Sequence, residues 1–388
     1  MRLTLKPSVV VSPCDDGALA YDIESGQLHR LNPLAALIVE LTSAQRSQED
    51  ILAEVAPLLG ESSAVGCEAW IAQAIAEGLL IDATVATAPP SADELRRIST
   101  ELRRTDHVLA AFLCQQQAVE IDSSDPQQWY RLGELAHIVG RRVEARAAYE
   151  EYQRACPQDA EVEHLLLALR DASPPPRASN TCIEHIYSYF ASFYDRNMCE
   201  ELEYQAPKFL WEALAMALSG RKDLIALDAG CGTGLFGLAI KPATQCLVGV
   251  DLSAAMIDQA RHRGIYDSLE KAELTEWFGR DPARQYDVIG LCDTLIYFGD
   301  LGQVLPAAFK HLKPGGMLGF TVEKGEVSPF IFTDSGRFTH HQNHLLAVVD
   351  AAGYRVVTQA EEVLRFEYGE AVHGWVTVVQ RPSDKSVV

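Results

Sequence analysis

The stretch Leu224-Ile-Ala-Leu-Asp-Ala-Gly-Cys-Gly-Thr-Gly234 decides the fold of the C-terminal half of the chain. Apolar residues run up to Asp228, glycines follow at 230, 232 and 234, and an apolar segment with helical spacing comes next. This order predicts a buried parallel strand, a tight glycine turn and the start of a helix. Glycine lets the backbone approach a ligand, and the first N–H groups of a helix are free donors. The turn is therefore a predicted ligand site at the edge of an α/β sheet.

The spacing of these glycines argues against a dinucleotide site. The dinucleotide pattern G-x-G-x-x-G requires glycine at position 235, where this chain has leucine. A second apolar run, Val248-Gly-Val-Asp251, ends in a carboxylate about twenty residues after Gly232, where such folds hold ribose hydroxyls. Together the two motifs favour a bound nucleoside over an ordinary tight turn.

The segments LDAGCGTG and VGVDLSAAMID together resemble class I S-adenosylmethionine (SAM)-dependent methyltransferases. The resemblance implies a Rossmann-like, seven-stranded α/β domain at 181–388 with strand order 3-2-1-4-5-7-6. It implies SAM as cofactor and S-adenosylhomocysteine (SAH) as product, with Asp228 at the methionine part, Asp251 at the ribose and Glu273 at the adenine. No metal is expected. The residues expected to bind the cofactor are Asp228, Gly230, Cys231, Gly232, Gly234, Asp251, Leu252, Met256, Glu273, Leu274 and Tyr194.

Two further segments resemble methyltransferases whose N-termini carry tetratricopeptide repeats. Tyr189 and Tyr194 loosely match a Y-A-x-x-Y-D-like segment that closes over the cofactor, and Ser335-Gly-Arg-Phe-Thr-His340 is similar to an S-G-R-Y-x-H segment. Core packing is the competing interpretation for the tyrosines, and a surface or core position is the competing one for the histidines. The candidate catalytic bases are His340, His341, Glu323 and Asp293, and the candidate substrate-binding residues are Tyr189, Tyr297 and Arg337.

The residues after the fourth predicted strand bear on the acceptor atom. An N-P-P-Y-type tetrad, typical of transfer to amide or base nitrogens, is absent, because positions 292–295 read Cys-Asp-Thr-Leu. This absence favours an oxygen acceptor, a carboxylate in the first place, and leaves transfer to carbon or nitrogen open.

Residues 1–85 form a predicted winged-helix-like module. Three β-like runs at 8–12, 18–23 and 27–31 form a meander, and helices follow from Asn32-Pro33, from Ser47 and over about 65–77. The module resembles the PqqD-like recognition elements (RRE) of enzymes that mature ribosomally synthesised, modified peptides (RiPPs). The resemblance implies that a precursor's leader adds as a strand to the meander and packs on the third helix. The alternative is a generic winged helix that binds DNA. The module has too few basic residues to favour DNA binding.

The middle segment, 93–172, carries the spacing of tetratricopeptide repeats (TPR). Small and aromatic residues from Pro126 onward, including Gly133 and Tyr149, match the 34-residue unit. About two helix pairs are expected, and they act either as a spacer or as a holder of substrate. Proline-containing linkers at 88–92 and 173–177 bound the segment.

Composition excludes several classes of function. The 388 residues carry a net charge of −21, which opposes binding to nucleic acid. Nine cysteines, none in a C-x-x-C pair, indicate reduced thiols in a cytoplasmic protein and no zinc site. No apolar run approaches a membrane span.

These observations predict an enzyme that methylates a ribosomally made precursor peptide, whose leader the N-terminal module binds. Other maturation enzymes are candidate partners. Two alternatives stay open: a small-molecule O-methyltransferase with structural N-terminal domains, and a non-catalytic scaffold that binds peptide and SAM.

Overall fold

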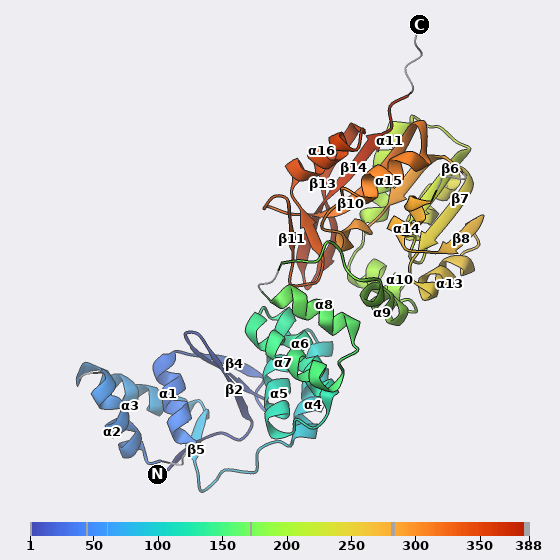
Figure 1. The fold of residues 1–388 in the computed structure, drawn as a ribbon. Coiled ribbons are helices and arrows are strands. Elements are labelled where there is room, and N and C mark those ends of the chain that lie inside the picture. The colour runs from blue at the N-terminus through green and yellow to red at the C-terminus, as the bar shows by residue number, and fades with distance from the viewer. Residues whose placement is uncertain (1, 44–45, 60, 171–172, 281–283, 384–388) are drawn as a thin grey trace. The chain divides into compact units, whose positions relative to one another are not determined.

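The computed structural model describes residues 2–43, 46–59, 61–170, 173–280 and 284–383. The chain forms two compact units, Met1–Pro157 and Gln158–Val388 (Figure 1). The second unit includes α8 (Ala160–Leu169), α9 (Asn180–Phe190), the short α10 (Tyr194–Arg196) and a π-helical turn at Asn197–Glu201. The domain ranges expected from the sequence, 1–85, 93–172 and 181–388, stay predictions. None of the described helices is both long and apolar enough to cross a membrane.

The first unit begins with the expected meander. Strands β2 (Val9–Cys14), β3 (Gly17–Asp22) and β4 (Gln27–Leu31) pair antiparallel in that order, as the sequence predicted. Asp22 fixes one end of the meander, because its carboxylate accepts hydrogen bonds from Ser8 Oγ at 2.6 Å and Ser25 Oγ at 2.8 Å. Burial alone would raise the pKa of Asp22, but these bonds lower it to about 2.

Three helices cover the core of this module: α1 (Pro33–Thr42), α2 (Gln48–Leu59) and α3 (Glu61–Ala76). Asn32 caps α1 as expected, because its Oδ1 accepts from the Ala35 N–H at 2.9 Å. The sequence did not predict a two-stranded ribbon of β1 (Leu3–Leu5) and β5 (Leu80–Asp82), whose three-residue strands are too short to show a period. The core below the helices is formed by Leu3, Ile38, Ile51, Ile71 and Leu80.

Four helices complete the unit: α4 (Ala92–Arg104), α5 (Val108–Ile121), α6 (Pro126–Ile138) and α7 (Arg142–Ala155). α4 packs on α5, and α6 packs on α7. Within the second pair a Cβ added at Gly133 would lie 2.6 Å from the Tyr149 ring, so the close approach of α6 and α7 requires glycine there. Two helix pairs agree with the expected number, whereas their tetratricopeptide identity stays a prediction.

The second unit is built on a nine-stranded sheet. Seven strands follow the order β8-β7-β6-β9-β10-β14-β13, which confirms the predicted order 3-2-1-4-5-7-6. β14 runs antiparallel to both of its neighbours, as expected of the last strand. The seven strands are β6 (Leu224–Ala229), β7 (Thr244–Asp251), β8 (Ser268–Lys271), β9 (Tyr286–Leu291), β10 (Leu312–Lys324), β13 (Arg355–Glu367) and β14 (Glu370–Gln380). A short hairpin of β11 (Phe330–Phe332) and β12 (Phe338–His340) extends the end of β10 and was not predicted.

Helices cover both faces of this sheet. Ala226 belongs to a hydrophobic core with α11 (Ala206–Leu218) and α12 (Leu235–Ile240), whereas Leu227 belongs to a separate core. The second core contains α14 (Leu274–Gly279), α15 (Val304–His311) and α16 (Gln342–Ala351). Neighbouring residues of a strand point to opposite faces of the sheet. A strand that is buried on both faces is therefore one continuous apolar run in the sequence. α13 (Ala254–His262) follows β7.

Candidate active site

The glycine loop between β6 and α12 is tied to the end of β7 by Asp251. The Gly232 N–H donates to Asp251 Oδ2 at 2.8 Å, and the Ser253 N–H donates to Oδ1 at the same distance. Gly230, Gly232 and Gly234 all have positive φ, and a Cβ at Gly230 would lie 2.3 Å from Thr294 Oγ1. The loop therefore requires glycine for its backbone as well as for access to a ligand.

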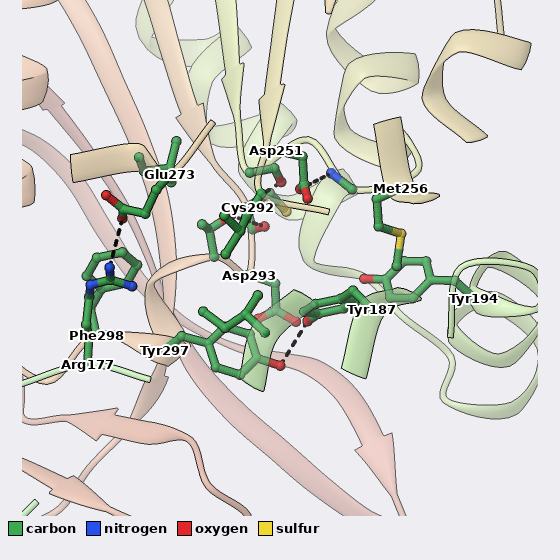
Figure 2. A pocket seen from close by; sticks show the side chains of 16 residues that line it. Arg177, Tyr187, Tyr194, Asp251, Met256, Glu273, Cys292, Asp293, Tyr297 and Phe298 are labelled. Atoms are coloured by element: carbon green, nitrogen blue, oxygen red, sulfur yellow. Dashed lines mark hydrogen bonds and ion pairs between the residues drawn. The ribbon is translucent and has the colours of Figure 1, made fainter. Parts of the chain in front are cut away.

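A pocket of about 660 Å³, including its open mouth, lies beside this loop (Figure 2). Its size suits a cofactor or a small ligand. Many of the residues predicted from the sequence line it: Tyr194, Gly230, Gly232, Asp251, Leu252, Met256, Glu273, Leu274, Asp293 and Tyr297. The others are Arg177, Ile183, Tyr187, Cys292, Thr294 and Phe298.

A smaller pocket of about 300 Å³ shares the glycine loop and Tyr194 with the first and is also lined by Asp228 and Cys231. Asp228 is 1% exposed, and its Oδ2 accepts from the Tyr266 hydroxyl at 2.6 Å, whereas its buried Oδ1 has no partner. Burial raises the pKa of Asp228 to about 7. Because a buried polar atom is seldom left without a partner, the free oxygen indicates a ligand with a hydrogen-bond donor.

Glu273 lies at the N-terminus of α14, and both of its carboxylate oxygens have partners. Its Oε2 accepts from the Glu276 N–H at 2.8 Å and so caps the helix, while Oε1 lies 3.7 Å from Arg177 Nη2. Burial would raise the pKa of Glu273, but hydrogen bonds from Thr275 and the helix N-terminus lower it. Only Oε1 is left for the adenine contact expected from the sequence.

Asp293 follows β9 and has the unusual backbone φ of +53°. Its side chain is 8% exposed, and Oδ2 lies 3.0 Å from Arg365 Nη1, whereas the buried Oδ1 has no partner. Burial raises the pKa of Asp293, and the Arg365 guanidinium opposes that shift. Of the four candidate bases, Asp293 is therefore the one that lines the pocket with a free oxygen.

Glu323 and Arg337 lie in a buried ion network and do not line this pocket. Arg337 Nε is 2.8 Å from Glu323 Oε1, and Arg337 Nη2 is 2.6 Å from Glu367 Oε2. Arg365 contacts both Glu323 and Glu367 as well as Asp293. Through Arg365, this network holds the Asp293 carboxylate in place.

The other residues predicted from the sequence also do not line this pocket. His340 is fully buried with Nε2 3.2 Å from the Gly299 carbonyl oxygen, and burial lowers its pKa to about 4. His341 caps α16, because its Nδ1 accepts from the Asn343 N–H at 3.2 Å. Tyr189 is 79% exposed. Gly234 begins α12 and approaches Tyr266 and Arg263.

The sequence did not predict three side chains at this site, Tyr187, Arg177 and Arg365, whereas it did predict Tyr297. Tyr187 and Tyr297 place their hydroxyl oxygens 2.9 Å apart at the pocket wall, and Arg177 lies beside Glu273 (Figure 2). Tyr187 stands seven residues before Tyr194 in one aromatic segment, and that segment could have pointed to it. Nothing in the sequence pointed to Arg365, which the fold brings to Asp293 from a distant strand.

A family model described as a methyltransferase domain matches residues 227–318, from β6 into β10, and so contains the glycine loop and Asp251. The chain contains a methyltransferase domain. Methyltransferase-like protein 27 of Homo sapiens is similar to it, at 34% identity over 144 residues, or 35% of this chain and 56% of that protein. A ubiquinone biosynthesis O-methyltransferase of Bordetella avium is 28% identical over 147 residues, 35% of this chain and 60% of that protein. The chain thus spans little more than half the length of these curated relatives.

Among solved structures, the N-methyltransferase NodS from Bradyrhizobium japonicum with bound SAH is 17% identical, with a TM-score of 0.37, over 45% of this chain and 87% of that one. A methyltransferase domain of this fold uses SAM as its methyl donor. The methyltransferase domain fits that cofactor, because the unpartnered Asp228 oxygen and the glycine cradle can hold an amino-acid group. In the described part of the chain no group of three His, Cys, Asp or Glu side chains could hold a metal ion.

We expect the pKa of Asp228 to make cofactor binding depend on pH, since the sequence predicts that Asp228 holds the cofactor's amino-acid end. Only the ionised carboxylate pairs with the ligand's ammonium group, and a pKa of about 7 leaves it mostly protonated at pH 6 and mostly ionised at pH 8. We expect SAH to bind about tenfold more tightly at pH 8 than at pH 6. Calorimetric titration at both pH values measures this, and Asp228→Asn should remove the difference. Equal affinities for the unchanged protein would contradict the assignment.

Proposed function

We propose that this protein is a SAM-dependent methyltransferase that modifies a ribosomally synthesised precursor peptide, whose leader binds the N-terminal module. The glycine cradle with two carboxylates, within the matched segment 227–318, carries the methyltransferase part of the proposal. Bound SAM supplies a methyl group on a sulfonium centre, which a correctly aligned nucleophile can take. The part of the protein is to hold acceptor and donor in line and to accept a proton where the acceptor carries one.

The cofactor's parts have separate partners in this proposal. Asp228 and the glycine loop hold the amino-acid end, Asp251 the ribose hydroxyls, and Leu274 and Met256 flank the adenine. These assignments rest on the two pockets described above, which share the glycine loop and whose walls contain these residues. They leave Asp293, Tyr187 and Tyr297 for the acceptor.

The meander of the first unit supports peptide binding. β4 pairs with β3 on one side, and no described strand pairs with its other edge. At the opposite side of the meander, Arg141 donates to Ser12 Oγ at 3.1 Å and to the Pro13 carbonyl oxygen, both in β2. Leu28 of β4 is 48% exposed beside the open edge. An open edge with an apolar side chain can accept an added strand.

The direct test is expression of the full chain with the precursor peptide encoded beside its gene. We expect the peptide to gain one methyl group, as measured by mass spectrometry. Leu28→Asp should weaken leader binding about tenfold or more, because a carboxylate at the strand edge opposes burial. Val143→Asp on α7, where the valine is 70% exposed, is the matched control and should bind normally. A leader that binds both variants and the unchanged chain equally would refute strand addition at β4.

The small-molecule O-methyltransferase remains the second candidate. The similarity to ubiquinone biosynthesis O-methyltransferases favours it. It predicts that the protein methylates a free metabolite and does not methylate the precursor. Leu28→Asp should leave the methylation of that metabolite unchanged. Methyl transfer to either acceptor would exclude a non-catalytic scaffold.

A further inference from the structure

One part of the pocket wall is formed by Asp293 and two tyrosines. Its Oδ1 is buried without a partner, while Arg365 holds Oδ2 at 3.0 Å. Tyr187 and Tyr297 lie at the same part of the pocket with hydroxyl oxygens 2.9 Å apart, and Figure 2 shows the Asp293 carboxylate beside them. Burial raises the pKa of Tyr297 to about 12, although the hydrogen bond with Tyr187 opposes the shift, so its hydroxyl stays protonated.

The charges of the pocket disfavour an anionic acceptor. Among its described lining residues there are three carboxylates, Asp251, Glu273 and Asp293, and a single cation, Arg177. Arg177 already has partners: Nη2 donates to Asn180 Oδ1 at 2.7 Å and lies 3.7 Å from Glu273 Oε1, and Nη1 donates to the Ala178 carbonyl oxygen at 3.1 Å. A carboxylate would therefore bring a further negative charge beside Asp293, while Arg177 already lies against Glu273, and burying a charge without a partner of its own is costly.

We propose, building on the proposed methyltransferase function, that the acceptor is a neutral hydroxyl group and that Asp293 Oδ1 binds it and takes its proton. A hydroxyl donates to Oδ1 and so gives a partner to a buried carboxylate oxygen that has none in the fold. The Tyr187–Tyr297 pair can offer a further hydrogen bond to the acceptor oxygen. Arg365 is a positioning residue, which holds the carboxylate through its other oxygen.

The transfer then balances. The acceptor oxygen forms a bond to the methyl group, its proton passes to Asp293 Oδ1, and the electron pair of the broken S–CH₃ bond remains on sulfur. SAH leaves neutral at sulfur, and Asp293 releases the proton to water. This inference differs from the carboxylate expected from the sequence, which would carry no proton for Asp293 to take.

Three probes of similar shape test the subsite: 4-methylphenol, 4-methylbenzyl alcohol and 4-methylbenzoate. Each is titrated calorimetrically into the SAH-saturated full chain. We expect at least one hydroxyl probe to bind about tenfold or more tightly than the benzoate, because a hydrogen bond to a charged group is gained and a like-charge contact avoided. Asp293→Asn should reduce that ratio to about threefold or less, and Tyr187→Phe should weaken the hydroxyl probe alone.

Asp350→Asn, an exposed change on α16, is the control and should keep the full ratio. SAH affinity is measured for every variant, so that a misfolded protein is recognised. Tighter binding of the benzoate to the unchanged chain, an unchanged ratio in a folded Asp293→Asn variant, or no binding of any probe to the SAH complex would overturn the inference. Failure of SAH itself to bind would instead overturn the proposed function on which it rests.

Discussion

Replacing Asp251 with asparagine weakens SAH binding by about 100-fold or more. Asp251 accepts hydrogen bonds from the Gly232 and Ser253 N–H groups at 2.8 Å each, one with each oxygen. Asparagine has one oxygen, so its NH₂ group must face one of these donors and push the glycine loop away. In the proposed binding mode the ribose hydroxyls lose a charged acceptor at the same time, and about 1.5–3 kcal/mol per charged hydrogen bond gives this fold-change for two bonds.

Calorimetric titration of SAH measures the effect. Asp258→Asn is the matched control on α13, since its side chain is 62% exposed and pairs with Arg261 at the surface. The control should bind SAH as the unchanged chain does. An Asp251→Asn variant that folds and binds within about threefold of normal would show that the carboxylate does not touch the cofactor.

Local patterns in the sequence were sufficient to predict those parts of the site whose residues are close together in the sequence. The glycine loop, the strand before it and Asp251 were predicted because each is marked by its own residue spacing. The strand order followed from the resemblance and is confirmed by the pairing of β14 between β10 and β13. The three-residue strands β11 and β12 escaped prediction because they are shorter than one recognisable period.

Long-range ion pairs could not be predicted in the same way. Glu323 was a candidate base because it ends a strand at the ligand edge, yet Arg337 and Arg365 occupy its carboxylate. Arg365 is 72 positions from Asp293 and 42 from Glu323, and no spacing rule connects residues so far apart. A strand-end carboxylate can be reactive or structural, and the difference lies in which cation the fold brings to it.

Replacing Arg365 with methionine destabilises the C-terminal unit by about 3–5 kcal/mol, the usual loss when one partner of a buried ion pair is removed. The Arg365 side chain is 3% exposed and contacts Asp293, Glu323 and Glu367. Without it, Arg337 alone remains for three carboxylates, of which Asp293 and Glu323 are 8% and 7% exposed. Urea unfolding should show the loss, and Arg355→Met at an exposed position of β13 is the control.

The loss should depend on pH in a defined direction. Burial already raises the pKa of Asp293, and removal of the Arg365 cation raises it further above the unfolded value of about 4. A carboxylate with a raised folded pKa stabilises the fold while protonated and loses that contribution as pH rises through the folded pKa. The Arg365→Met variant should therefore lose more stability, relative to the unchanged chain, at pH 8 than at pH 5. A deficit of equal size at both pH values would mean that lost packing of the Arg365 side chain, rather than its charge, accounts for the effect.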